Sequence, residues 1–191
     1  MKRLCSAAIL SILAVLATLT CAYGIRYDGP YNGRVIDADT AAPVEGVVVL
    51  GVWNTEQITP GGAVHNFHDA RETVTDKNGD FEIPGMGLMM LGNVTPMDVL
   101  IFKAGYEHIG MGSWASLKED LILRKKITWE EKKAIIPLKK LTMEERRKLG
   151  DPPDPPTEAP VEKVKLTLKE INKDRAERGL KPRQMWRGDK L

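Results

Sequence analysis

The residues best suited to metal chemistry share one short segment, His65-Asn66-Phe67-His68-Asp69. On a helix, two imidazoles three positions apart could reach one metal ion, and the Asp69 carboxylate would add an oxygen ligand. The segment follows Pro60-Gly61-Gly62, however, and no Glu separates the histidines as it does in the zinc-protease motif. We therefore favour a solvated loop over a metal site at His65, His68 and Asp69.

A second oxygen-rich pattern, Asp76-x-Asn78-x-Asp80, has the spacing that begins a calcium-binding loop. Such a loop needs glycine at its sixth position and glutamate at its twelfth, where this chain has Phe81 and Gly87. The pair Asn78-Gly79 is typical of a tight turn, because both residue types tolerate positive φ. We expect a β-hairpin instead, with residues 71–75 and 80–83 as its strands.

Few residues are suited to nucleophilic catalysis. Beyond residue 24 the chain has no cysteine, and its only serines, Ser113 and Ser116, lie outside any Gly-x-Ser-x-Gly motif. Five methionines of the middle region could line a copper site or a binding surface, but filling gaps in the core is their commoner use. They are Met86, Met89, Met90, Met97 and Met111. The sequence therefore predicts neither enzymatic activity nor a cofactor.

The N-terminus has the pattern of a secretory signal peptide over residues 1–24. Two basic residues precede an uncharged, largely apolar run at residues 4–25, which contains the small-x-small exit Ala22-Tyr23-Gly24. We predict cleavage after this exit, which would remove both cysteines. The run is also long enough for an uncleaved membrane anchor. A lipid anchor on Cys21 is a third alternative, although the preceding residues fit a lipobox poorly.

Residues 25–140 are predicted to form an all-β domain, an antiparallel β-sandwich. Short apolar or alternating segments separated by turn residues are typical of that fold. The expected strands cover residues 31–37, 44–53, 71–75, 80–83, 98–104 and 134–138, with a weaker one at 121–123. Residues 54–70 are polar and contain glycine, so we expect a long loop there.

Three motifs lie in this region, in order along residues 31–106. The first comprises Gly33, Val35, Asp37, Thr40, Pro43, Val44, Gly46, Val47 and Val49; the second is Thr75-Asp76-x-x-Gly79-x-Phe81-x-Ile83; the third is Lys103-x-Gly105-Tyr106. Together they resemble the carboxypeptidase regulatory-like domain family. The resemblance implies a transthyretin-like (prealbumin-like) β-sandwich of the exported bacterial type, without catalytic activity.

Two segments depart from the family pattern, residues 54–70 and residues 107–132. Loops on a rigid sandwich commonly carry recognition. We therefore expect a binding face at residues 54–70 or at residues 107–118, where His108 and Trp114 are the candidate binding residues.

Residues 141–191 form a charged tail. A capping box, Thr142 with Glu145, predicts a short helix, and the proline-rich residues 151–160 predict a stiff, extended linker. Residues 167–178 predict a second helix with a narrow apolar stripe, which we expect to be solvated or only transiently docked. Residues 25–140 carry 13 Lys and Arg against 16 Asp and Glu, whereas the tail carries 13 against 10. The tail could therefore fold back on the domain, or meet an acidic partner or membrane surface.

These patterns predict an exported, non-catalytic β-sandwich module with a binding, structural or assembly role at the cell envelope. Its location would be the periplasm, the outer envelope or the extracellular space, and its partner an envelope protein or a carbohydrate. Nucleic acid is not expected, because the net charge is only +2, and membrane contact would come only through an uncleaved signal sequence. The alternatives are a metal-dependent envelope enzyme that uses His65 and His68, and a membrane-anchored adaptor that acts through its basic tail.

Overall fold

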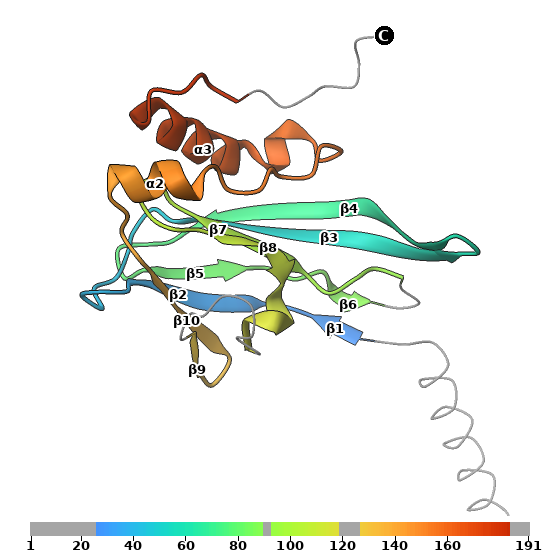
Figure 1. Ribbon diagram of the computed structural model, residues 1–191. Helices are drawn as coiled ribbons and strands as arrows, with labels where there is room; N and C mark the ends of the chain where they lie inside the picture. Colours follow the sequence, from blue (N-terminus) through green and yellow to red (C-terminus); the bar gives the residue numbers. More distant parts are fainter. Residues whose placement is uncertain (1–25, 90–92, 119–126, 184–191) are drawn as a thin grey trace, which may run out of the picture.

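Two four-stranded sheets stack face to face, and the C-terminal helices form a third layer over one of them (Figure 1). The computed structural model describes residues 26–89, 93–118 and 127–183. The predicted signal peptide, the weaker strand at 121–123 and Met90 lie outside the described residues. The elements are β1 (Arg26–Asp28), β2 (Tyr31–Asp37), β3 (Val48–Thr59), β4 (Gly62–Val74), β5 (Asp80–Ile83), β6 (Gly87–Met89), β7 (Asp98–Phe102), β8 (Ile109–Ser113), the 3-10 turn η1 (Trp114–Lys118), β9 (Thr128–Glu130), β10 (Lys133–Leu138), α2 (Met143–Leu149), η2 (Val161–Lys163) and α3 (Lys165–Glu177).

The first sheet has the strand order β4-β3-β7-β8 and is covered on both faces. Where β3 and β7 pair, nearly every side chain is buried, which explains why their sequences show no alternation of apolar and polar residues. One row of side chains, which includes Val49 and Ile101, faces the second sheet. The opposite row, which includes Leu50 and Leu100, faces the C-terminal layer.

The second sheet has the strand order β5-β2-β10-β9. Residues 134–138 were expected to close the sandwich, and β10 confirms this by pairing with β2, Ile136 opposite Val35. The pair is parallel, however, so the expectation of a wholly antiparallel sandwich is wrong at this position. β10 is the return strand of a hairpin with β9, and that hairpin sets its direction beside β2. The other strand pairs among the described residues are antiparallel.

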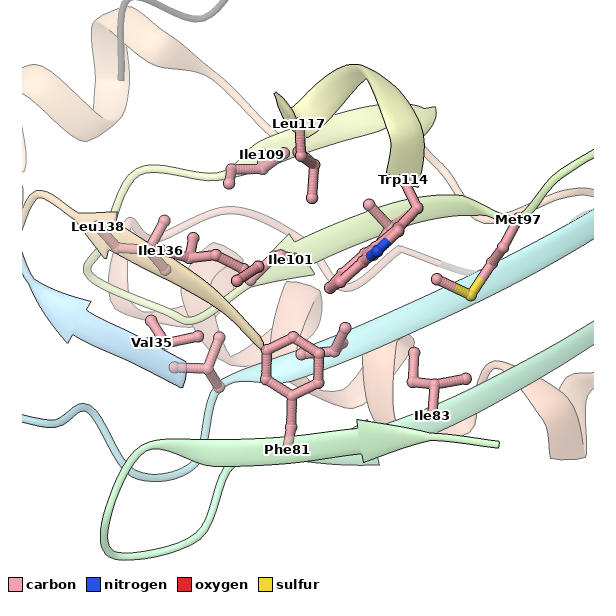
Figure 2. Packing of buried hydrophobic residues seen from close by; sticks show 14 of the residues in the cluster. Val35, Phe81, Ile83, Met97, Ile101, Ile109, Trp114, Leu117, Ile136 and Leu138 are labelled. Atoms are coloured by element: carbon pink, nitrogen blue, oxygen red, sulfur yellow. The ribbon is translucent and has the colours of Figure 1, made fainter. Parts of the chain in front are cut away.

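The main core lies between the two sheets (Figure 2). Phe81 and Ile83 share the inner face of β5, as the alternation of that strand predicts. The rings of Phe81 and Trp114 meet edge to face with centroids 6.1 Å apart, a preferred aromatic geometry. Met97 is fully buried against Gly51, so the prediction that the methionines fill gaps in the core is confirmed for this residue.

A buried carboxylate fixes β1 to this core. Asp28 accepts hydrogen bonds from the hydroxyl of Tyr31 at 2.5 Å, the indole N–H of Trp53 at 2.9 Å and the backbone N–H of Met86 at 2.9 Å. Burial, together with the hydrogen bond to Asp28, raises the pKa of Tyr31 far above its usual range. The three bonds satisfy a carboxylate that would be costly to bury alone, and they join β1, β3 and the segment before β6.

The turn at residues 76–79 connects the two sheets. The Asp76 carboxylate accepts hydrogen bonds from the N–H groups of Asn78 and Asp80, and Gly79 has a φ of +74°, so the predicted tight turn is confirmed. The predicted hairpin of residues 71–75 and 80–83 is wrong, because β4 pairs with β3 while β5 pairs with β2. Burial of the inner face of β5 favours its pairing with β2 in the second sheet. The turn at residues 76–79 therefore carries the chain from one sheet to the other.

Residues 54–70 form strands, and the predicted long loop is wrong. β3 and β4 pair from Val48 opposite Val74 to Thr59 opposite Gly62, with a bulge at Trp53/Asn54. The outer part of this ribbon covers no core, so it needs no apolar alternation and resembles a loop in composition. The strand expected at 44–53 begins only at Val48.

The C-terminal tail is packed on the first sheet, so the expectation of a solvated helix is wrong. Ile171 of α3 and Val164 just before it are fully buried, and Val164 belongs to the apolar cluster of Leu50 and Leu100. Glu72 of β4 accepts hydrogen bonds from the first N–H groups of α3, so the sheet itself caps the helix. The predicted capping box that begins α2 is confirmed.

An ion network joins α2, α3 and the proline-rich segment between them. Arg146 of α2 donates to Asp174 of α3 at 2.5 and 3.0 Å, and Arg178 donates to the same carboxylate at 2.7 Å. Arg178 and Arg175 also pair with Asp151. Burial alone would raise the pKa of Asp151, but hydrogen bonds and charge contacts with these two arginines hold that pKa below its usual value.

Replacement of Arg146 by Met tests this network. The change leaves Asp174, whose side chain is 6% exposed, without one of its two cations. We expect the free energy of unfolding to fall by about 3 kcal/mol, as for other broken buried ion pairs. Urea denaturation followed by circular dichroism measures it. Arg147→Met, an exposed neighbour on α2, is the control and should change stability by less than about 0.5 kcal/mol; equal effects of the two variants would contradict the account.

Candidate functional site

The residues predicted as metal ligands do not form a shared site. His65 and His68 lie on β4 with exposed side chains, and His68 falls at the bulge. The carboxylate of Asp69 is already engaged, because it pairs with Lys163 of η2 and with Arg71. In residues 26–89, 93–118 and 127–183, no three His, Cys, Asp or Glu side chains come together in a way that could hold a metal ion.

The oxygen atoms of the calcium-like pattern serve the fold. Asp76 stabilises the turn between the sheets, and the carboxylate of Asp80 pairs with Arg34 at 2.6 Å and with Lys133 at 2.8 Å. The hydrogen bond from Arg34, followed by that from Lys133, lowers the pKa of Asp80 to about 2. Asp80 therefore carries its charge at neutral pH and shares it with two cations of the second sheet.

The candidate binding residues of segment 107–118 differ in burial: Trp114 is buried and His108 is half-buried. Trp114 is 8% exposed, and its ring contacts Tyr31 and Trp129 with centroids 5.6 and 5.8 Å away. His108 is half-buried and lies edge to face with Phe102 at 6.5 Å. These contacts give Trp114 a role in packing and leave little of its ring for a ligand.

A broad, shallow hollow of about 720 Å³ lies at the second sheet, beside β5 and the β9–β10 hairpin. It is lined by Asn32, Asp80, Phe81, Glu82, Glu130, Glu131, Lys132 and Lys133. Four carboxylates and two ammonium groups thus surround the hollow, and Asp80 and Lys133 are already paired with each other. Because charges of both signs line the hollow, they do not favour a ligand of one charge. Because the hollow is shallow, it offers little hydrophobic contact to a ligand.

The outer half of the β3–β4 ribbon, residues 54–67, projects beyond the sandwich, and we call it the arm (Figure 1). β7 pairs with β3 only along residues 48–52, and the backbone of residues 93–95 bonds β3 as far as Glu56. Beyond Glu56, no third strand of the described chain pairs with the arm. Ile58 is 91% exposed and Val64 44% exposed.

The sequence predicts a loop where the arm has two paired strands, so the strand structure of this segment was missed. The useful signal is Thr59-Pro60-Gly61-Gly62, a turn-forming sequence with β-branched residues, Ile58 and Val64, shortly before and after it. Residues 57–67 also contain no Asp, Glu, Lys or Arg, in a chain of which 28% is charged. An uncharged, exposed ribbon is suited to contact with another backbone or an apolar surface.

Comparison of the chain with protein-family models, with curated proteins and with solved structures finds no match. None of the helices in the described part of the chain is both long enough and apolar enough to cross a membrane.

Metal analysis tests the assignment of His65 and His68. Because Asp69, the carboxylate of the predicted ligand set, is paired with Lys163 and Arg71, we expect the purified protein to retain far less than one equivalent of zinc or copper after dialysis. Elemental mass spectrometry measures the metal content, with a His65→Ala/His68→Ala double variant as the matched control. One tightly held equivalent in the wild type that disappears in the double variant would establish the metal site instead.

Proposed function

We propose that the chain is an exported, non-catalytic β-sandwich module of the transthyretin-like kind, with a binding or assembly role at the cell envelope. The pattern of residues 1–24 supports export to the periplasm, the outer envelope or the extracellular space. The three motifs that resemble the carboxypeptidase regulatory-like domain support the family, and two stacked sheets are compatible with it.

The main support for the proposal is the exposed strand edge of the arm. A strand at a sheet edge presents unpaired N–H and C=O groups, and proteins usually protect such edges with charge, proline or a covering segment. In the arm the only proline is in the turn, and residues 57–67 contain no Asp, Glu, Lys or Arg. An edge of this kind suits strand addition, in which the main chain supplies affinity and exposed side chains supply specificity.

The tail contributes to stability in this proposal. Its arginines at positions 146, 175 and 178 pair with carboxylates of the tail, so they offer less charge to an acidic partner or membrane than the composition alone suggests. This pairing weakens the alternative of an adaptor that acts through a basic tail. The pairing of Asp69 weakens the alternative of a metal-dependent enzyme in the same way.

Affinity capture from the envelope fraction tests the proposal. In the shortened variant, Asn-Gly replaces residues 57–64 and joins Glu56 to His65, which are opposite each other in the ribbon. We expect this variant to melt like the wild type, because the arm buries little of the core, and to lose the envelope partner that the full chain captures.

A second variant, Glu82→Lys/Glu130→Lys, reverses two charges in the hollow of the second sheet and leaves the arm intact. It should capture the same partner as the wild type. The role of the arm would be contradicted if the shortened chain captured the partner as well as the wild type and the Glu82→Lys/Glu130→Lys variant did not. The binding site would then lie on the second sheet.

A further inference from the structure

The acidic side chains of α3 are engaged by other parts of the domain. Glu170 accepts a hydrogen bond from the backbone N–H of Ala104 at 2.9 Å. Asp174 binds the two arginines described above, and Glu177 pairs with one of them, Arg146, at 2.8 Å. The helix contains no other Asp or Glu, so its negative charges are used in holding the tail to the domain.

The lysines of α3 lie on the opposite, outer side of the helix. Lys165, Lys169 and Lys173 are exposed and follow one another at intervals of four residues, so they form a row along one face, which we call the lysine row. Among the described residues, Lys165 and Lys169 form no ion pair, and Lys173 has one, with Glu170 at 3.4 Å. The side of α3 that faces solvent is therefore cationic.

This arrangement of charges suits a negative partner outside the chain. Like charges four residues apart on a helix repel each other and destabilise it, and the lysine row contains two such pairs. The carboxylates that could offset them are engaged on the inner side of the helix. An anionic partner would relieve the repulsion, so the row is complementary to negative charge.

The shape of the surface favours an extended partner over a small anion. α3 belongs to the outermost layer of the molecule, and its outer side faces away from both sheets (Figure 1). At a rise of about 1.5 Å per residue, the row is about 12 Å long. A convex helix surface does not enclose a small ion, whereas a flat anionic surface can contact all three ammonium groups at once.

The residue types favour a membrane over an acidic protein. Arginine, whose planar guanidinium recognises carboxylates with defined geometry, is used in the buried network with Asp151 and Asp174. The row consists of lysine, which acts as a hydrated point charge. Aromatic side chains, which dominate many protein–protein contacts, are missing from α3. Attraction through point charges alone is typical of binding to anionic lipid head groups.

We propose that the lysine row holds the domain against a membrane surface rich in anionic phospholipids, with the ammonium groups beside the lipid phosphates. The contact needs no apolar insertion, so it is reversible and weakens as salt concentration rises. It goes beyond the proposed function, because it involves α3 and not the arm. It also provides a membrane contact that does not require an uncleaved signal sequence.

Vesicle binding by the purified exported chain tests the proposal. Vesicles of equal parts phosphatidylglycerol and phosphatidylcholine provide the anionic surface, and vesicles of phosphatidylcholine alone measure the contribution that does not depend on lipid charge. We expect the wild type to cosediment more strongly with the anionic vesicles, and we expect this preference to disappear at high salt concentration.

Two variants of the lysine row separate charge from structure. Lys165→Gln/Lys169→Gln/Lys173→Gln removes the charges and keeps good helix formers, so it should bind the anionic vesicles on the order of a hundredfold more weakly. Lys165→Arg/Lys169→Arg/Lys173→Arg keeps the charges and should bind at least as tightly as the wild type. Thermal melting followed by circular dichroism confirms that each variant is folded.

The matched control removes the same charge elsewhere. Lys77, Lys132 and Lys140 are exposed and lie outside α3, so Lys77→Gln/Lys132→Gln/Lys140→Gln changes the net charge equally and leaves the row intact. It should bind nearly as well as the wild type, because charges far from the membrane are screened by salt.

Three results would overturn the inference. They are equal loss of binding in the two glutamine variants, no preference of the wild type for anionic vesicles, and binding of poly-glutamate through the lysine row without binding of anionic vesicles. The last result would identify an acidic protein as the partner. Capture of an envelope partner through the arm does not depend on the lysine row, so the proposed function is tested separately.

Discussion

Asp174 is a buried carboxylate that two arginines share, and the arrangement of the C-terminal layer depends on it. Arg146 reaches it from α2 and Arg178 from the end of α3, while a second carboxylate, Asp151, binds Arg178 from the proline-rich segment. Buried ions of this kind are favourable only when every partner is in place, so the network selects one geometry for the tail. That geometry brings Val164 onto the apolar row of the first sheet. Because the tail lies on this row, β3 and β7 are buried on both faces.

With one face of the first sheet closed by the tail and the other by the second sheet, contact with a partner is left to few surfaces. The hollow on the second sheet is shallow, and its charges are mixed and partly paired. The arm differs from it in two ways, because it lies outside the sandwich and its outer residues carry no formal charge. The tail covers the edge of β4 at its base, and Phe67 packs against the apolar cluster that includes Val164 of the tail. Beyond Phe67, toward the turn, the side chains of the arm are exposed.

Local patterns predicted the local structure well. Residues 31–37, 98–104 and 134–138 correspond to β2, β7 and β10, and the capping box begins α2 as expected. Apart from the hairpin of the arm, the errors concern pairing over long distances. An Asn-Gly turn specifies a tight reversal but not whether its flanking strands join one sheet or two. The arm has the composition of a loop because nothing covers it, and the docking of α3 depends on Asp174 meeting arginines from other segments, which periodicity does not reveal. For the same reason, the pairing of Asp69 with Lys163 was not visible in the sequence.

The central claim is that the tail is an integral layer of the domain and closes one face of it. Hydrogen exchange of the backbone amides of α3 (Lys165–Glu177), measured in the native protein at neutral pH, tests this claim most directly. The account predicts that the amides around Ile171 exchange on the same timescale as those of β3 and β7, whose face they cover. Exchange of these amides as fast as in a solvated helix, while the sheets remain protected, would contradict it.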